Sequence, residues 1–282
     1  MTTHTPTTWF VTGTSRGLGL QLVRQLLERG DNVAATTRST DRLLTALRDA
    51  DTTRLLAQSV DLTDANAVEQ AVHRTTERFG GLDTVVNNAG YGYLAAVEET
   101  TDAAARQMFD VQIFGLWNVL RSVLPIIRSQ QSGHIINVSS VLGLTAMPGW
   151  GLYCAAKFAL EGLSESLAAE VSEFGGRVTI VEPGYFRTDF LTPQSLALPE
   201  STTDGYASIR EMTQNHLDLQ GSQLGDPAKG AAAIISIAAS TDGPLRRLLG
   251  SDSYAYATAK VGALSADFET GKQLAHTTDF NR

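Results

Sequence analysis

The chain has 282 residues, of which 43% are hydrophobic and 18% charged, so it can bury a sizeable core and lacks the composition of a disordered protein. A formal net charge of −8 without a basic run argues against binding to nucleic acid or to an anionic membrane surface. The single cysteine, Cys154, excludes an internal disulfide and a cysteine metal cluster, which fits a reducing cytoplasm.

Histidine spacing and apolar run lengths narrow the class of protein further. The five histidines are scattered, without the paired spacing on a helix that zinc sites show, so we expect no metal. The first residues, MTTHTPTT, lack a basic start followed by an apolar stretch, and apolar stretches such as 231–239 are too short to span a bilayer. We therefore expect a soluble cytoplasmic protein without a membrane association.

Taken in chain order, short apolar runs alternate with longer segments of helical period. The expected strands are TWFVT (8–12), NVAATT (32–37), RLLAQSV (54–60), LDTVVNN (82–88), GHIINVS (133–139), RVTIVEP (177–183) and a short one at 245–250. The expected helices are 18–29, 41–50, 64–79, 102–129, the segment around Tyr153, 207–219, 227–239 and 254–268. Strands without polar alternation are typical of a sheet covered on both faces, so the pattern predicts a doubly wound parallel α/β sheet.

Neither a linker nor a change of composition divides the chain, so we expect one domain over residues 1–282. The longest irregular segment is 185–226. An insertion of this length in a compact domain is usually a lid or a binding loop, and disorder is the alternative.

A glycine-rich stretch, FVTGTSRGLGL, lies where the first strand turns into the first helix. Gly13, Gly17 and Gly19 allow a tight turn and let a pyrophosphate approach the free N–H groups of the helix N-terminus. The spacing is GxxxGxG rather than GxGxxG, and glycines at such a junction can also serve the turn alone. Their position in the first βα unit favours dinucleotide binding.

A tyrosine and a lysine four residues apart share one face of the helix expected from LYCAAKFALEG at 152–162. Ordinary, partly exposed surface pairs have the same spacing. A chemical role is the other interpretation, because a phenol titrates near ~10 and a cation one turn away lowers that pKa. The spacing of Tyr153 and Lys157 alone leaves both interpretations open.

Six short motifs follow one another along the chain. They are TGTSRGLG (12–19), DLTD (61–64), NNAG (87–90), INVSS (136–140), YCAAK (153–157) and PGYFRT (183–188). In this order they resemble the compact single-domain type of the short-chain dehydrogenase/reductase family, and in particular its hydroxysteroid/carbonyl reductase branch. The helix with Tyr153 especially resembles the hydroxysteroid and retinol dehydrogenases. The resemblance implies a Rossmann fold that binds a nicotinamide dinucleotide and interconverts a carbonyl and an alcohol.

The resemblance implies three catalytic roles. Tyr153 would exchange a proton with the substrate oxygen, Lys157 would lower the pKa of that phenol and hold the nicotinamide ribose, and Ser140 would hold the substrate oxygen. These roles fit the chemistry, because a carbonyl that accepts hydride needs a proton donor and a fixed hydrogen bond at its oxygen. Cys154 lies about 100° round the helix from Tyr153 and is expected to be a packed residue rather than a nucleophile.

One position departs from the family pattern. Many members carry an asparagine in the long fourth helix, which organises a water that links the lysine to solvent, whereas FDVQIFG places Gln112 there. Glutamine keeps the backbone carbonyl that largely holds this water, but its longer side chain needs a new partner. Proton relay through Gln112 is therefore in question, and we expect a working enzyme with a slower relay.

The resemblance also implies a set of dinucleotide-binding residues at the strand-helix junctions. They are Gly13, Ser15, Arg16, Gly17, Leu18, Gly19, Arg38, Asp61, Leu62, Asn87, Ala89, Gly90, Tyr153, Lys157, Pro183, Gly184, Phe186 and Thr188. Each could also be plain loop architecture.

We expect the dinucleotide to be NADP(H). NAD-selective relatives usually end the second strand with a carboxylate for the ribose 2′-hydroxyl, and this chain has Thr37 there, followed by Arg38. Arg16 offers a second guanidinium, and paired arginines suit a 2′-phosphate through charge-assisted hydrogen bonds. Either arginine by itself could also be a solvated residue at a helix start.

The expected substrate walls are rich in apolar and aromatic side chains. They are Tyr91, Tyr93, Leu142, Leu144, Met147, Trp150, Tyr185, Phe186 and Phe190, which favour an apolar or aromatic carbonyl compound, although such residues also pack within their own domain. We expect a homodimer or homotetramer, with 103–129 and 153–174 as the candidate interfaces.

The leading functional hypothesis is an NADPH-dependent carbonyl reductase that also runs in reverse as an alcohol dehydrogenase. A non-catalytic NADP-binding sensor or scaffold is the alternative from another class, motivated by Gln112 and the long insertion. An epimerase or dehydratase is a third possibility. The intact set of Ser140, Tyr153 and Lys157 favours an enzyme, because a sensor does not need a proton donor.

Overall fold

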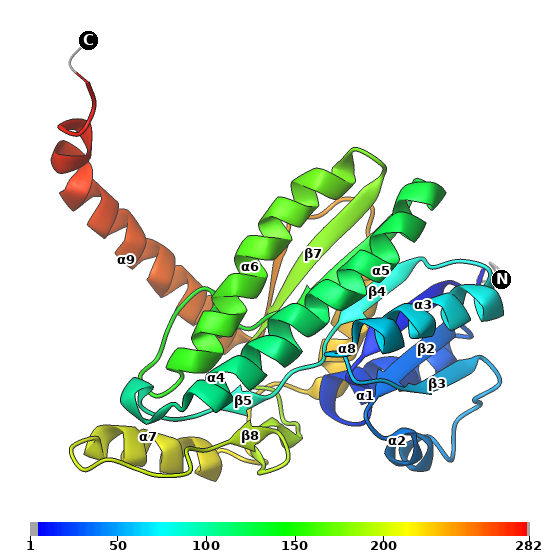
Figure 1. Cartoon of the computed structure of the whole chain (residues 1–282), viewed down its shortest axis with the longest axis horizontal. Helices are drawn as coiled ribbons and strands as arrows, with labels where there is room; N and C mark the ends of the chain where they lie inside the picture. The colour runs from blue at the N-terminus through cyan, green and yellow to red at the C-terminus, as the bar shows by residue number, and fades with distance from the viewer. Residues whose placement is uncertain (1–4, 281–282) are drawn as a thin grey trace.

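The computed structural model describes residues 5–280 and has a seven-stranded parallel sheet at its centre (Figure 1). The strand order is β3-β2-β1-β4-β6-β7-β9. These strands are β1 (Thr8–Thr12), β2 (Asn32–Thr37), β3 (Leu55–Ser59), β4 (Thr84–Asn87), β6 (Gly133–Val138), β7 (Gly176–Pro183) and β9 (Arg246–Leu249). The expected doubly wound parallel sheet is confirmed. The expectation of no targeting segment concerns a chain start whose residues 1–4 lie outside the described part.

Helices cover both faces of the sheet (Figure 1). They are α1 (Gly17–Glu28), α2 (Thr40–Ala46), α3 (Ala65–Phe79), α4 (Asp102–Phe109), α5 (Gly115–Gln130), α6 (Gly151–Ser172), α7 (Ala207–Asp218), α8 (Pro227–Ala239) and α9 (Ser251–His276). Apolar residues of α3, α5 and α6 pack on one face, and those of α1, α2 and α8 pack on the other. Figure 1 shows α9 extending away from this layered body.

Strand β1 illustrates why the strand sequences lack polar alternation. All five of its residues are buried, with Phe10 in the core of one face and Trp9 and Val11 in the core of the other. Successive side chains of a strand point to opposite faces, and both faces here are covered by helices. Because β1 lies between β2 and β4, the chain changes direction across the sheet at β1 and β4, which places a crevice at their carboxyl ends.

Three expected helices differ from the structure by more than one residue at an end or in their continuity. The expected helix 102–129 consists of α4 and α5, which are joined without a break by a π-helical turn at Asp110–Phe114. The second helix ends at Ala46 rather than at residue 50. The last helix is longer than the expected 254–268, because residues 269–276 include neither a proline nor a run of β-branched residues that would oppose helix.

The segment 185–226 has secondary structure of its own. Strand β8 (Leu196–Ala197) pairs with the two-residue strand β5 (Gly92–Tyr93), and α7 coincides with the helix expected near 207–219. Figure 1 shows β8 and α7 as a separate layer at one end of the sheet. The alternative that the whole segment is disordered is therefore wrong.

The helical run Asp102–Gln130 has the length and apolar composition that a membrane-crossing helix needs. Half of its most apolar window is buried inside the protein, and core helices meet the same criterion. In the described structure, its α5 portion contributes to the core on one face of the sheet.

Candidate functional site

A cavity of about 480 Å³ opens at the carboxyl ends of the central strands. It brings together most of the predicted site residues: Gly13, Ser15, Arg16, Gly17, Leu18, Arg38, Asp61, Leu62, Ala89, Gly90, Ser140, Tyr153, Lys157, Pro183, Gly184, Phe186 and Thr188. They come from the carboxyl ends of β1, β2, β3, β4, β6 and β7, from the loops that follow these strands, from the start of α1 and from α6. The topology therefore gathers around one crevice residues as far apart in sequence as Gly13 and Thr188.

The glycine turn after β1 has no room for side chains. Gly13 has a φ of +71°, and a Cβ there would lie 2.7 Å from the Cα of Ala89. A Cβ at Gly19 would lie 2.4 Å from the backbone oxygen of Gly13. Gly17 has a φ of +57° at the start of α1. The start of α1, at Gly17 and Leu18, lines the cavity, and a helix N-terminus with free N–H groups suits a pyrophosphate.

Asn88 holds this turn in place and was missed by the sequence analysis. Its Nδ2 donates to the backbone oxygens of Thr12 and Gly13, both at 3.0 Å, while the Thr12 hydroxyl accepts from the backbone N–H groups of Asn88 and Ala89. Asn88 also lines the cavity. Its place just past the end of β4 was the available signal, since residues there face the carboxyl edge of the sheet.

Asn87 was predicted to bind the dinucleotide, but its side chain points away from the cavity. It is buried and its Nδ2 donates to Oδ1 of Asn137 at 2.8 Å, and Asn137 in turn donates to Ser164 on α6. Consecutive residues of a strand face opposite sides, so Asn87 and Asn88 cannot both face the cavity. Gly19 also does not line the cavity and serves the packing of the turn instead.

The outer end of the cavity carries positive charge. Arg38 is exposed after β2, and Arg16 is partly buried with Arg38 and Arg42 close enough to lower its pKa. Burial is the largest cause of that lowering, and Asp189 opposes it. Arg16 also donates to the hydroxyl of Ser195 at 3.1 Å, which ties it to the 185–226 segment.

The three predicted catalytic side chains meet at the inner end of the cavity. Tyr153 and Lys157 lie one turn apart on α6 and are only 6% and 5% exposed, and Ser140 follows β6. The Lys157 ammonium lies 5.6 Å from the centre of the Tyr153 ring and donates to the backbone oxygen of Val138 at 3.1 Å. The interpretation of an exposed surface pair is therefore wrong.

The phenol of Tyr153 is less acidic than the sequence analysis expected. Burial raises its pKa above the ordinary value, and the hydrogen bond with Ser140 lowers the pKa by less. The expected lowering by Lys157 is not found in the chain alone, because a phenolate loses its hydration at this buried position. Burial also lowers the pKa of Lys157 to about 8, against the opposing effect of Glu161.

Gln112 lies behind the catalytic side chains and does not line the cavity. Its Nε2 donates to the backbone oxygen of Tyr91 at 2.9 Å and contacts the sulfur of Met108. Its buried Oε1 has no hydrogen-bond partner in the described chain. Gly90 separates it from Lys157: a Cβ at Gly90 would lie 3.0 Å from that oxygen and 3.7 Å from the lysine Nζ. The new partner that the glutamine side chain needs is therefore the Tyr91 carbonyl.

Most of the expected substrate walls line the cavity, namely Tyr91, Leu142, Met147, Trp150, Tyr185, Phe186 and Phe190, whereas Tyr93 and Leu144 do not. The rings of Trp150 and Phe190 pack edge-on against Tyr153, with centroids 5.5 and 5.8 Å away. His216 was missed. Its Nε2 lies 2.7 Å from the Tyr185 hydroxyl and 3.3 Å from Nε1 of Trp150, so α7 supports two walls of the cavity.

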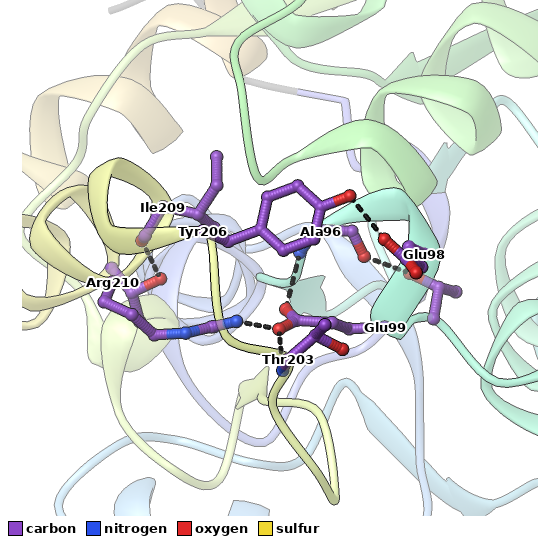
Figure 2. Close-up of polar contacts among 9 residues, drawn as sticks. Ala96, Glu98, Glu99, Thr203, Tyr206, Ile209 and Arg210 are labelled. Carbon is purple, nitrogen blue, oxygen red and sulfur yellow. Dashed lines mark hydrogen bonds and ion pairs between the residues drawn. The ribbon is translucent and has the colours of Figure 1, made fainter.

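A buried carboxylate fastens the 185–226 segment to the rest of the protein (Figure 2). Glu99 has a fully buried side chain and accepts from the backbone N–H groups of Thr203 at 2.7 Å and Ala96 at 3.1 Å. Arg210 of α7 forms an ion pair with the same carboxylate. The neighbouring Glu98 accepts from the Tyr206 hydroxyl at 2.6 Å. Figure 2 shows these side chains converging between the two segments.

Within residues 5–280, no group of three or more His, Cys, Asp or Glu side chains is arranged to hold a metal ion. The expectation of a metal-free protein remains a prediction.

Comparison with known proteins identifies the family. The model of the short chain dehydrogenase family matches residues 7–198. Oxidoreductase BOA17 of Botryotinia fuckeliana is 37% identical over 266 residues, covering 94% of this chain and 97% of that protein. The 3-ketodihydrosphingosine reductase of Bacteroides thetaiotaomicron is 33% identical over 85% of this chain and 86% of its own length.

A solved structure supports the same relationship. The crystal structure of a short-chain dehydrogenase from Streptomyces avermitilis has a TM-score of 0.90 and 35% identity, and the match covers 98% of this chain and 100% of that one. The chain belongs to the short-chain dehydrogenase family, and it is an oxidoreductase. Solved structures of similar fold but lower identity hold NADP in some cases and NAD in another, so the fold accommodates either dinucleotide.

The buried Glu99 carboxylate predicts how firmly the 185–226 segment is held. Glu99→Gln removes the charge that Arg210 and Thr203 share, which should weaken the attachment by about 2 kcal/mol. Amide hydrogen exchange in 199–219 should then accelerate by roughly 30-fold. Glu98→Gln is the matched control, since it alters only the exposed contact with Tyr206. Equal exchange rates in the two variants would contradict the assignment.

Proposed function

We propose that this protein is an NADPH-dependent reductase of ketones or aldehydes that also oxidises the corresponding alcohols. One observation carries the proposal: Ser140, Tyr153 and Lys157 meet at the buried end of a cavity whose other end has the glycine turn and two arginines. One end of the cavity offers cationic side chains for a phosphate and backbone N–H groups for a pyrophosphate. The other end offers a proton donor for a carbonyl substrate.

The chain's own residues would act on the substrate oxygen. The dinucleotide, when bound, supplies the hydride. Ser140 would donate a hydrogen bond that holds the carbonyl, and Tyr153 would give its proton to the oxygen as negative charge develops there. Lys157 would hold the ribose and, once charged, stabilise the phenolate that remains. The aromatic rings of Trp150 and Phe190 would exclude water from this step.

The preference for NADPH rests on the charge at the outer end of the cavity. Thr37 takes the place of the carboxylate that would repel a 2′-phosphate, and Arg38 is exposed at the same strand end. Arg16 is held nearby through Ser195. Both guanidinium groups suit a phosphate better than a ribose hydroxyl.

The proposed substrate is an apolar or aromatic carbonyl compound. The aromatic and aliphatic walls support this class, and the name of the Bacteroides relative, a 3-ketodihydrosphingosine reductase, describes a ketone reductase. We also propose that 185–226 acts as the lid of one single domain, since it lines the cavity and is fastened by Glu99.

The assembly and location follow the family resemblance. We propose a cytoplasmic homodimer or homotetramer whose interfaces involve 103–129 and 153–174. Exposed aromatic side chains on these helices, Phe114, Trp117 and Phe158, support that placement. The alternative of a non-catalytic sensor rests on Gln112 in place of the family asparagine and on the long 185–226 segment.

Tyr153→Phe tests the enzyme against the sensor. It should lower kcat by about a hundredfold to ten-thousandfold, because the proton donor is lost, while NADPH still binds. The assay follows NADPH oxidation with a graded panel of apolar, aromatic and steroid ketones. Tyr254→Phe, on the exposed face of α9, is the control and should keep wild-type turnover. If neither the wild type nor Tyr153→Phe turns over any ketone although both bind NADPH, the protein is better described as a sensor.

Arg38→Asp tests the choice of dinucleotide. The new carboxylate should weaken NADPH binding by roughly 10- to 100-fold and leave NADH binding nearly unchanged, because only NADPH has the 2′-phosphate. Fluorescence titration of both dinucleotides measures the ratio. Arg48→Asp makes the same charge change away from the cavity and should not alter it. A similar loss for both dinucleotides would refute the assignment.

Gln112→Asn tests the proton relay. The shorter amide should release the Tyr91 carbonyl and restore the family arrangement, so kcat should rise by a few-fold and the solvent deuterium isotope effect on kcat should fall. Unchanged values of both would remove Gln112 from the relay.

A further inference from the structure

A pair of buried carboxylates lies behind Lys157. Glu161 follows Lys157 by one turn of α6, as Lys157 follows Tyr153, so the three side chains form a line along one helix face. Glu161 is 5% exposed, and Glu182 on β7 is fully buried. Neither acid lines the cavity, and neither is used in the reaction proposed above.

The charges of this cluster do not balance. The guanidinium of Arg246 on β9 lies between the two acids. Its Nη2 is 3.3 Å from Oε2 of Glu161, and its Nε is 3.3 Å from Oε1 of Glu182. The same guanidinium also pairs with the half-exposed Glu165. All four carboxylate oxygens of Glu161 and Glu182 are buried away from solvent. One guanidinium therefore pairs with three acids, two of them removed from water.

Two buried carboxylates this close cannot both stay ionised at low cost, so the pair is best described as sharing one proton. Burial, together with the negative charge of Glu161, raises the pKa of Glu182 to about 8, and Arg246 opposes this. Burial also raises the pKa of Glu161, which Ser139, Arg246 and Lys157 oppose. The two acids therefore titrate as a coupled pair, and the higher pKa of Glu182, about 8, favours Glu182 as the site of the shared proton.

Glu161 is also the acid that acts on Lys157. The groups around the ammonium are the Tyr153 ring on the same helix, the backbone oxygen of Val138 and, across Gly90, the uncharged Gln112. Burial lowers the pKa of Lys157 to about 8, and the Glu161 charge raises it. Without that carboxylate, the lysine would lose its charge at a lower pH.

We propose that Glu161 is a positioning residue that keeps the Lys157 ammonium charged and directed toward the dinucleotide ribose, while Glu182 carries the proton that the two acids share. This inference rests on the proposed function. It gives three side chains along one face of α6 different roles: Tyr153 contacts the substrate, Lys157 contacts the dinucleotide, and Glu161 stabilises the charged form of Lys157.

The test compares the isosteric variants Glu161→Gln and Glu182→Gln. In this proposal only the charged form of Lys157 supports NADPH binding and turnover. That form is lost as the pH rises through the pKa of Lys157. Glu161→Gln removes the charge that raises this pKa, so the alkaline limb should move to lower pH by about one unit or more. Glu182→Gln imitates the protonated acid and leaves the Glu161 carboxyl in place, so its pH profile should follow that of the wild type up to about pH 7, and its alkaline limb should move by less than that of Glu161→Gln.

Two readouts are recorded from pH 5.5 to 9.5: the Kd of NADPH by fluorescence, and kcat/KM with acetophenone. Near pH 7.5, NADPH should bind Glu161→Gln several-fold more weakly than wild type, and lowering the pH to 6 should restore binding. Circular dichroism and thermal melting establish that the variants fold. If Glu161→Gln does not fold, Glu161→Asp keeps the charge on a shorter side chain, and its limb should shift by less than one unit.

The outcomes separate this proposal from the proposed function. NADPH binding needs no carbonyl substrate, so a protein that reduces no ketone would still show the shifted limb if Glu161 sets the charge of Lys157. Equal losses at every pH in both glutamine variants would indicate a purely structural cluster and overturn the proposal. An unshifted limb in a folded Glu161→Gln protein would overturn it as well.

Discussion

Removal of water from the inner end of the cavity is the constraint on which the other features of the site depend. Tyr153 and Lys157 are both almost fully buried, and burial shifts each pKa toward the neutral form. A dry site strengthens every electrostatic interaction within it, but it also makes any charge costly to hold. Neighbouring side chains offset part of this cost: Ser140 forms a hydrogen bond with the phenol of Tyr153, and the Glu161 carboxylate raises the pKa of Lys157.

Close packing and hydrogen bonds hold the glycine turn in place. Gly13 and Gly19 leave no space for a Cβ, and Asn88 spans the gap between β1 and β4 with two hydrogen bonds to backbone oxygens. Thr12 completes the junction by accepting two N–H groups from the opposite loop. The point where the sheet topology reverses is thereby rigid, which keeps the proposed dinucleotide site in a constant relation to the residues of α6.

The 185–226 segment joins both ends of the cavity. It supplies Ser195 to the arginine end and Phe190 to the tyrosine end, and Glu99 fastens it through Thr203 and Arg210. His216 of α7 adds a hydrogen bond to the wall residue Tyr185. Movement of this segment would therefore change the cavity near the proposed 2′-phosphate site and near the proposed catalytic site together.

The sequence alone determined the parallel sheet, the glycine turn and the shared face of Tyr153 and Lys157, because strand alternation and helical period are local properties of the backbone. It did not separate Asn87 from Asn88 in the NNAG motif, and it expected the phenol pKa to fall where burial raises it. Hydration at Tyr153 depends on Ser140, Trp150 and Phe190, and in our proposal the charge of Lys157 depends on Glu161, whose carboxylate pairs with Arg246. Only the tertiary structure decided these, because desolvation is set by residues that are distant in sequence and become neighbours once the chain is folded.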